Sequence, residues 1–170
     1  REAFGAYQEQ LVARFHPVPV IAAQYKTGDR APRKLAPTAP ATESASPAEW
    51  TERLKAFALK CGAELVGIAR LDPAWIFEGY EVPDHPFVVV FGIAMDHARL
   101  AEAPSTHENP LSALEVAEQY NRGASIAANV TQWVRERGFE ATAHQGPWAG
   151  SLSMLPAALA SGFGELGKHG

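Results

Sequence analysis

The chain has 170 residues, a formal net charge of −4 and a hydrophobic content of 46%, which suits one globular domain with its own core. The acidic balance and the lack of a Lys/Arg run argue against a nucleic-acid surface. A single cysteine, Cys61, excludes an internal disulfide and any metal or iron–sulfur site built from cysteines of this chain alone. No apolar run reaches membrane-spanning length and no signal-peptide core is present, so we expect a cytoplasmic protein without a membrane span. Because the chain begins at Arg1 and ends in a glycine-rich stretch, we also expect it to be a piece of a longer protein.

The first 46 residues are predicted to form an arm that precedes the domain. Residues 1–15 have apolar side chains at helical spacing, and His16-Pro17 ends that pattern. Between Lys26 and Pro47 the sequence is rich in Pro, Ala, Thr and Ser and has no apolar periodicity, as in a linker or a wrapped arm. We therefore divide the chain into an N-terminal arm and linker, residues 1–46, and a domain, residues 47–170.

A helix is predicted to begin after Ser46 and to end at Gly62. Ser46 is a good N-cap, Pro47 suits the first helical position and Glu49 completes a capping box. Glycine is the usual residue just past a helix end. Cys61 lies on the predicted inner face, and we interpret it as a core thiol rather than a reactive one, since nothing nearby would lower its pKa. The other members of that face are Trp50, Leu54, Phe57 and Ala58.

Two apolar runs predict neighbouring strands, over residues 65–71 and 87–94. The second is apolar on both faces and rich in valine, which predicts a buried strand. His97 stands next to Asp96 after this strand, but adjacent side chains point apart and no partner follows at metal-ligand spacing. We therefore predict no metal site there, and a polar loop over residues 98–110.

The second half of the domain is predicted to contain one long helix, over residues 111–137, which Gly138 ends. A third strand is predicted over residues 139–143, then a loop, and then a short helix that begins near Ser153. Adjacent strands crossed by a long helix predict an α+β sandwich.

The chain closes on Gly162, Gly164 and Gly167, which spell G-x-G-x-x-G. A dinucleotide site needs a strand before this pattern and a helix after it. Here an Ala- and Leu-rich helix precedes it, and no apolar periodic segment follows. We interpret the glycines as a helix C-cap followed by a loop whose backbone closely approaches a neighbour or a large ligand.

Three segments resemble the cobalamin-dependent reductive dehalogenases, with a looser similarity to epoxyqueuosine reductases. The first is CGAELVGIA at 61–69 followed by FVVVFGIAMD at 87–96. The second is Tyr120-Asn121, the small-residue helix 124–133 and VRERGFEA at 134–141. The third and most specific is LPAALASGFGELGK at 155–168. The resemblance runs in order from Pro47 to Gly170.

The resemblance implies a nitroreductase-like α+β fold that holds cobalamin rather than flavin, and the two-electron removal of halide from an organohalide. It also implies that two 4Fe–4S clusters supply electrons in the complete protein. The family's cluster-binding cysteines come later, so this chain does not ligate the clusters. An external electron donor, a ferredoxin or a reductase domain, is implied as a partner. The lack of the twin-arginine export signal found in respiratory members favours a cytoplasmic, catabolic-type relative.

The resemblance also implies roles for individual residues. A tyrosine at the position of Tyr120 is the proton donor, although its helix face alone favours a core aromatic. The phenolate left behind needs a nearby cation; Arg122 points elsewhere along the helix, so Lys168 or a residue outside this chain is the better candidate. The implied cobalamin contacts are His144, Gln145, Gly146, Trp148, Ser151, Ser153, Gly162 and Gly164. An ordinary surface loop over 144–153 remains the alternative, and no residue is predicted to ligate cobalt.

Two other functions remain open at this point. One is a cobalamin-binding or carrier module without redox chemistry of its own, and the other is a flavin enzyme of the nitroreductase type. The sequence does not specify a substrate. Three aromatic residues would either line a pocket for a halogenated ring or belong to the core: Trp75, Phe77 and Trp148.

Overall fold

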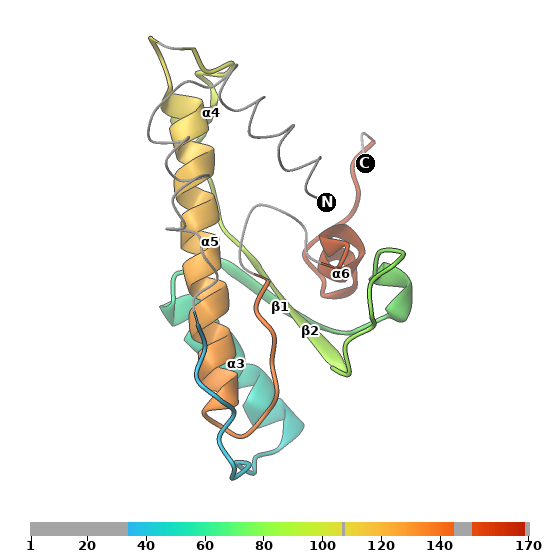
Figure 1. Ribbon diagram of the computed structural model, residues 1–170. Helices are drawn as coiled ribbons and strands as arrows, with labels where there is room; N and C mark the ends of the chain where they lie inside the picture. Colours follow the sequence, from blue (N-terminus) through green and yellow to red (C-terminus); the bar gives the residue numbers. More distant parts are fainter. Residues whose placement is uncertain (1–33, 107, 145–150, 169–170) are drawn as a thin grey trace. The chain divides into compact units, whose positions relative to one another are not determined.

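The computed structural model describes residues 34–106, 108–144 and 151–168. They belong to two compact units, each considered by itself below. Unit I contains the described residues of 94–122, and unit II contains 34–93 and the described residues of 123–168. Figure 1 shows the elements in chain order, which are α3 (Pro47–Lys60), β1 (Leu65–Arg70), the short 3-10 helix η1 (Pro73–Trp75), β2 (Phe87–Gly92), α4 (His97–Leu100), α5 (Leu111–Arg135) and α6 (Met154–Ala160). The helix expected within residues 1–15 lies outside the described residues.

Helix α3 begins and ends as its sequence predicts. The Ser46 side chain accepts a hydrogen bond from the Glu49 backbone N–H, and the Glu49 carboxylate accepts one from the Ser46 backbone N–H at 2.8 Å. At the other end, Gly62 N–H donates to the Leu59 carbonyl and Ala63 N–H to the Ala58 carbonyl. This pair of bonds is the Schellman motif, which satisfies the last carbonyls of a helix.

Strands β1 and β2 form an antiparallel pair in which Leu65 lies opposite Gly92 and Arg70 opposite Phe87. The strand expected over 87–94 is therefore confirmed in position, but the expectation that it is buried is wrong. Every residue of β2 is at least partly accessible, and Phe87 is 54% exposed. The described sheet has two strands, so β2 has a partner on one edge only.

The third strand expected over residues 139–143 is not formed. Among the described residues the sheet contains β1 and β2 alone. The Phe139 ring instead packs edge-on against Trp50, with centroids 5.2 Å apart. The Ala141 carbonyl accepts a hydrogen bond from Arg135 Nε at 2.9 Å, so its partner is a side chain and not the backbone N–H of another strand. Residues 139–143 contain one large apolar side chain, Phe139, so few side-chain contacts would stabilise this segment as a strand of the sheet.

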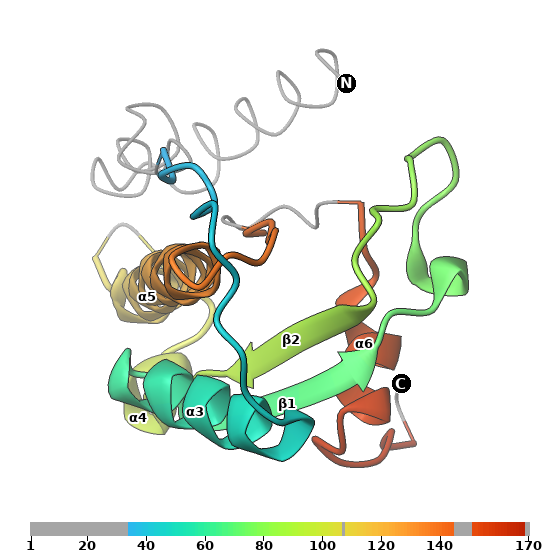
Figure 2. The ribbon, with the colours of Figure 1, turned by 90° about the horizontal axis from the view of Figure 1, so that it is seen from below.

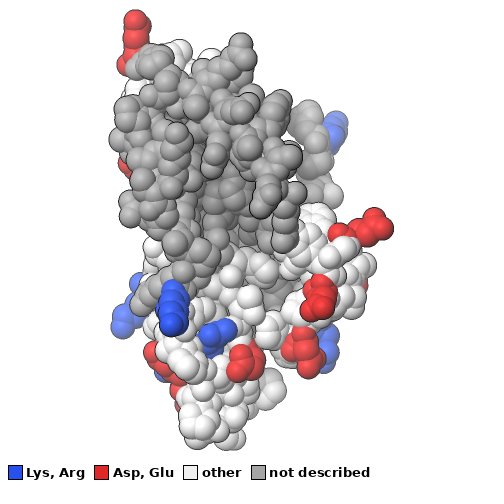
Figure 3. All heavy atoms as spheres, in the orientation of Figure 1, with Lys and Arg blue, Asp and Glu red and all other residues white. Residues whose placement is uncertain are grey.

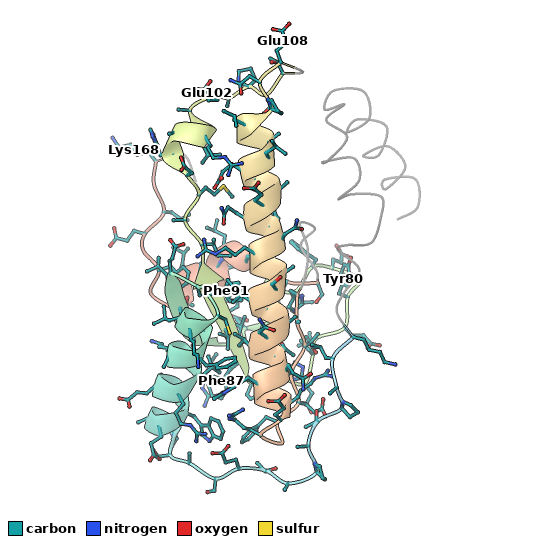
Figure 4. All side chains as sticks on the ribbon, turned by 90° about the vertical axis from the view of Figure 1, so that its left-hand side faces the viewer. Tyr80, Phe87, Phe91, Glu102, Glu108 and Lys168 are labelled. Carbon is teal, nitrogen blue, oxygen red and sulfur yellow. The ribbon has the colours of Figure 1, made fainter. Side chains whose placement is uncertain are left out.

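The core of unit II lies between one face of the sheet, α3 and the later part of α5 (Figure 2). Its buried members are Ala58, Ala63, Ile126 and Val130, and partly buried side chains pack around them: Phe57, Cys61, Val66, Phe91 and Ile93. Phe91, labelled in Figure 4, is the residue through which β2 packs against these buried side chains. Cys61 belongs to this layer as expected, and desolvation raises the pKa of its thiol, which disfavours a reactive thiolate.

Residues 34–46 run along the end of α5. The Ala39 N–H donates to the Arg135 carbonyl at 2.9 Å, and the Glu43 N–H to the Arg137 carbonyl at 3.0 Å. Gly138, at φ +82°, ends α5, and a Cβ there would collide with the backbone of Ala41. Glycine is thus required at this point both by the backbone angle and by the approach of the preceding segment.

In unit I, the prediction of a polar loop over residues 98–110 is wrong at its start, because helix α4 spans His97–Leu100. Asp96 is its N-cap, and its side chain accepts from the Arg99 N–H at 3.0 Å. The carboxylate beside His97 therefore has a structural role at a helix start. None of the described helices combines the length and the apolar character needed to cross a bilayer.

Candidate functional site

Tyr120 lies on α5 within unit I and is 41% exposed. An exposed fraction of this size does not fit the alternative of a buried core aromatic. Arg122 Nη1 donates to Gln119 Oε1 at 3.3 Å, so the guanidinium already has a partner on its own helix. Tyr120 thus has the accessibility that a proton donor needs.

A fully buried carboxylate, Glu115, precedes Tyr120 on α5. Its Oε1 accepts from the Asp96 N–H at 2.8 Å and from Gln119 Nε2 at 2.9 Å, and its Oε2 accepts from Arg99 Nη1 at 2.6 Å. These bonds tie the chain after β2 and α4 to the helix that carries Tyr120. Sequence reasoning missed this residue. The available signal was a charged side chain between two apolar ones, Leu114 and Val116.

Arg99 also bonds the exposed Glu118, with Nη1 to Oε2 at 2.6 Å. The hydrogen bond with Glu118 is the main cause that raises the pKa of Arg99, and in return the Arg99 guanidinium lowers the pKa of the Glu118 carboxyl. Both signs of charge occur on the described part of the face in Figure 3. Among the described residues, no three potential metal-binding side chains come together.

The predicted cobalamin loop belongs to unit II and is described in part. Gln145, Gly146 and Trp148 lie outside the described residues. His144 is accessible at its surface, yet enough protein surrounds the ring for desolvation to lower its pKa, and the nearby His85 lowers it further. His85 Nε2 lies 3.1 Å from Thr142 Oγ1, two residues before His144. The imidazole of His144 therefore favours its neutral form.

Residues 151–153 pair with the segment around η1, which the sequence did not predict. Ile76 and Leu152 form an isolated antiparallel bridge. The Phe77 N–H donates to the Ser151 carbonyl and the Ser153 N–H to the Trp75 carbonyl, each at 2.8 Å. This arrangement fixes the position of the predicted serines relative to two aromatic residues 74 or more places earlier.

The bridge also sorts side chains between two faces, because successive residues of an extended segment point to opposite sides. Leu152 is 7% exposed and points inward. Ser151 and Ser153 consequently share the opposite face with Phe77, whereas Trp75 is the last residue of η1 and meets this segment through its carbonyl. Ser153 is the N-cap of α6 but makes no side-chain capping bond. Among the residues that the structure describes, none is hydrogen-bonded to either serine hydroxyl.

The glycine close begins with a Schellman motif at the end of α6. Gly162 N–H donates to the Leu159 carbonyl at 3.0 Å and Phe163 N–H to the Ala158 carbonyl at 3.1 Å. Gly162 has φ +83°, which confirms the predicted C-cap, and Gly164 has φ +151°.

The close approach expected of these glycines is not made to any described residue. A Cβ placed on Gly162, Gly164 or Gly167 has nothing within 4 Å. The N–H groups of residues 164–167 likewise have no hydrogen-bond partner in the part of the chain that the structure describes. Among the described residues the turn is therefore backbone that no other element covers, with N–H groups that none of those residues bonds. Lys168 is exposed beyond it (Figure 4).

Comparison with known proteins gives a distant relationship. No family model matches the chain. It is 27% identical over 110 residues to the tetrachloroethene reductive dehalogenase of Dehalobacter restrictus (strain DSM 9455 / PER-K23), a match that covers 64% of this chain and 18% of that protein. A tetrachloroethene reductive dehalogenase of Desulfitobacterium hafniense matches with the same identity and coverage. The chain thus spans under a fifth of the length of these relatives. The matches support a distant relation to reductive dehalogenases.

Proposed function

We propose that this chain is part of a cobalamin-dependent reductive dehalogenase of nitroreductase-like α+β fold. The observation that carries the proposal is the match to two tetrachloroethene reductive dehalogenases over 64% of the chain. The reaction class is R–X + 2 e⁻ + H⁺ → R–H + X⁻, where R–X is an organohalide. The carbon–halogen bond breaks, a carbon–hydrogen bond forms and the substrate is reduced by two electrons.

The described residues of unit II fit a large polar cofactor such as cobalamin. A corrin carries amide side chains, which need donors and acceptors, on a broad apolar ring. Ser151 and Ser153 offer hydroxyls that no described residue bonds, on a segment paired with Trp75 and Phe77, and the turn at Gly162 and Gly164 offers backbone that no described residue approaches. His144, favoured in its neutral form, adds a further hydrogen-bonding ring. When bound, cobalamin would supply the electron pair that expels halide.

Tyr120 supplies the proton in this proposal. Its Oη–H donates to the carbon that loses halide, and the resulting phenolate is reprotonated from solvent, which its accessibility allows. The two electrons come from an external donor, a ferredoxin or a reductase domain, through two 4Fe–4S clusters held outside this chain, and we place the reaction in the cytoplasm.

Cofactor retention tests the proposal directly. The purified chain is mixed anaerobically with cobalamin or with flavin mononucleotide, passed through gel filtration and examined by absorbance. Retention of cobalamin with the protein peak is expected, and the Ser151→Ala/Ser153→Ala variant should retain less. Retention of flavin but not cobalamin would overturn the proposal in favour of a flavin enzyme. Cobalamin retention without any dehalogenation by the complete, electron-supplied protein would instead identify a carrier.

A tyrosine pair in the complete protein tests the proton donor. Tyr120→Phe should lower the dehalogenation rate by roughly 10²- to 10⁴-fold, the usual contribution of a positioned general acid. Tyr80→Phe is the matched control, because Tyr80 is 40% exposed and Tyr120 is 41% exposed. Tyr80 adjoins the proposed cobalamin contacts, since its N–H bonds the Phe77 carbonyl, but its hydroxyl has no role in the proposed proton transfer, so its variant should keep most of the wild-type rate. Equal rates for both variants would remove Tyr120 from the mechanism.

A further inference from the structure

Two strand glycines form a notch on the face of the sheet that is turned toward α6. A Cβ at Gly67 would lie 2.6 Å from Ser161 Cβ and 2.8 Å from Phe163 Cε1. A Cβ at Gly92 would lie 3.4 Å from Phe163 Cε2. Distances below 3.0 Å are sterically forbidden, so any larger residue at Gly67 must displace the end of α6.

Register explains why these two positions act together. Gly92 is paired with Leu65, and Gly67 lies two residues further along the same strand. The two glycines are therefore diagonal neighbours on one face, whereas Val66 and Phe91 point to the opposite face and its core. The Phe163 ring occupies the space that the two missing side chains leave.

Phe163 differs in burial from the rest of the glycine close. It is partly buried, whereas Gly162 and every residue from Gly164 to Lys168 are exposed. Within this described segment, the Phe163 ring therefore provides the contact with the sheet. Its N–H bond to the Ala158 carbonyl holds the same residue to α6 at 3.1 Å. One residue thus joins the turn to both the helix and the sheet.

We infer that Phe163, seated in the notch of Gly67 and Gly92, is a positioning residue for the ligand-binding backbone of the glycine close. The inference rests on the proposed function for the identity of the ligand, cobalamin. An anchored turn presents its N–H groups in one arrangement, so less conformational entropy is lost when the ligand binds. Without the anchor, the backbone of residues 164–167 would have to be ordered on binding, and the lost conformational entropy would weaken the affinity.

Amide hydrogen exchange tests the anchor without any cofactor. In Phe163→Ala, protection of the amides at positions 162 and 163 should fall about tenfold or more, because local opening becomes easier. The equivalent Schellman amides of Gly62 and Ala63 belong to the same unit and serve as the internal control. They should keep their protection, whereas general destabilisation would lower both pairs. Unchanged protection at 162 and 163 would overturn the anchor.

Two further variants keep the test open if Phe163→Ala folds poorly. Gly67→Ala should reproduce the loss of protection from the opposite side of the contact, because its methyl group displaces Ser161 and Phe163. Phe163→Leu fills most of the notch and should stay within about threefold of wild type. Wild-type protection at position 162 in Gly67→Ala would contradict the notch.

Cobalamin titration then tests the positioning role. Phe163→Ala should weaken cobalamin binding about tenfold or more, and Phe163→Leu should restore most of it. If wild type and Phe163→Ala bind cobalamin equally while their exchange differs, Phe163 is structural only and the positioning role is wrong. If wild type binds no cobalamin, the proposed function fails and the positioning role fails with it, whereas the exchange data still decide whether the anchor exists.

Discussion

The pair Glu115 and Glu118 offers a test of whether burial or distance governs the ion pairs on α5. Both carboxylates bond the same atom, Arg99 Nη1, at 2.6 Å. The Glu115 side chain is 1% exposed and that of Glu118 is 54% exposed. We predict that Glu115→Ala lowers the free energy of unfolding much more than Glu118→Ala does.

The expected difference follows from what each substitution leaves behind. Glu115→Ala leaves the Asp96 N–H and the Gln119 amide without their acceptor in a partly buried place, and removing the buried partner from such a network costs about 3 kcal/mol. Glu118→Ala removes a solvent-exposed pair, worth at most about 1 kcal/mol. The change in helix propensity is the same in both variants and cancels.

Thermal and urea unfolding followed by far-UV circular dichroism measure the difference. For a chain of this length about 1 kcal/mol corresponds to roughly 2–4 °C in Tm, so Glu115→Ala should melt roughly 6–12 °C lower and Glu118→Ala less than about 4 °C lower. Glu115→Gln, which keeps one acceptor oxygen, should fall between them. Equal losses for the two alanine variants would refute the argument from burial.

Two further predictions concern unit II. Gly138 and Gly162 have nearly the same φ, +82° and +83°, but a Cβ on Gly138 meets the Ala41 backbone and one on Gly162 meets no described residue within 4 Å. Gly162→Ala should therefore cost about 1–2 kcal/mol and Gly138→Ala at least about 1 kcal/mol more; equal losses in urea unfolding would argue against the contact. The His144 pKa lies below its ordinary value of 6.5, mainly through desolvation, so the folded state binds the proton less readily and stability falls as the pH drops below about 6.5. An NMR titration should show a His144 midpoint that is below this value and rises in His85→Ala; a midpoint at or above it contradicts the burial of the ring.

Helix α3 was predictable because its determinants are local. The capping box joins residues three apart, and the Schellman motif needs only a glycine after the last turn. The ends of α5 and α6 follow the same rule at Gly138 and Gly162. In each case the sequence contains both partners of the bond within six consecutive residues.

Contacts between distant residues were not predictable in the same way. The Ile76–Leu152 bridge places Ser151 and Ser153 beside Trp75 and Phe77, but no local signal marks either segment as a strand. The third strand expected near Phe139 failed for a related reason, because the Trp50 ring competes for the same side chain. Pattern reasoning identifies an apolar residue but not the surface against which it packs.

The glycines show how one residue type serves two distinct physical needs. The G-x-G-x-x-G letters drew attention to Gly162 and Gly164, yet these positions require glycine for their backbone angles and face open space. The close approach between α6 and the sheet occurs instead at Gly67 and Gly92, which lie outside the G-x-G-x-x-G pattern and within strands. Glycine within a strand weakens a sheet, and it often marks a place where another element approaches closely. Here the space left by the two glycines is occupied by the Phe163 ring. The signal for the anchored turn was therefore the pair of glycines in the strands rather than the three at the end of the chain.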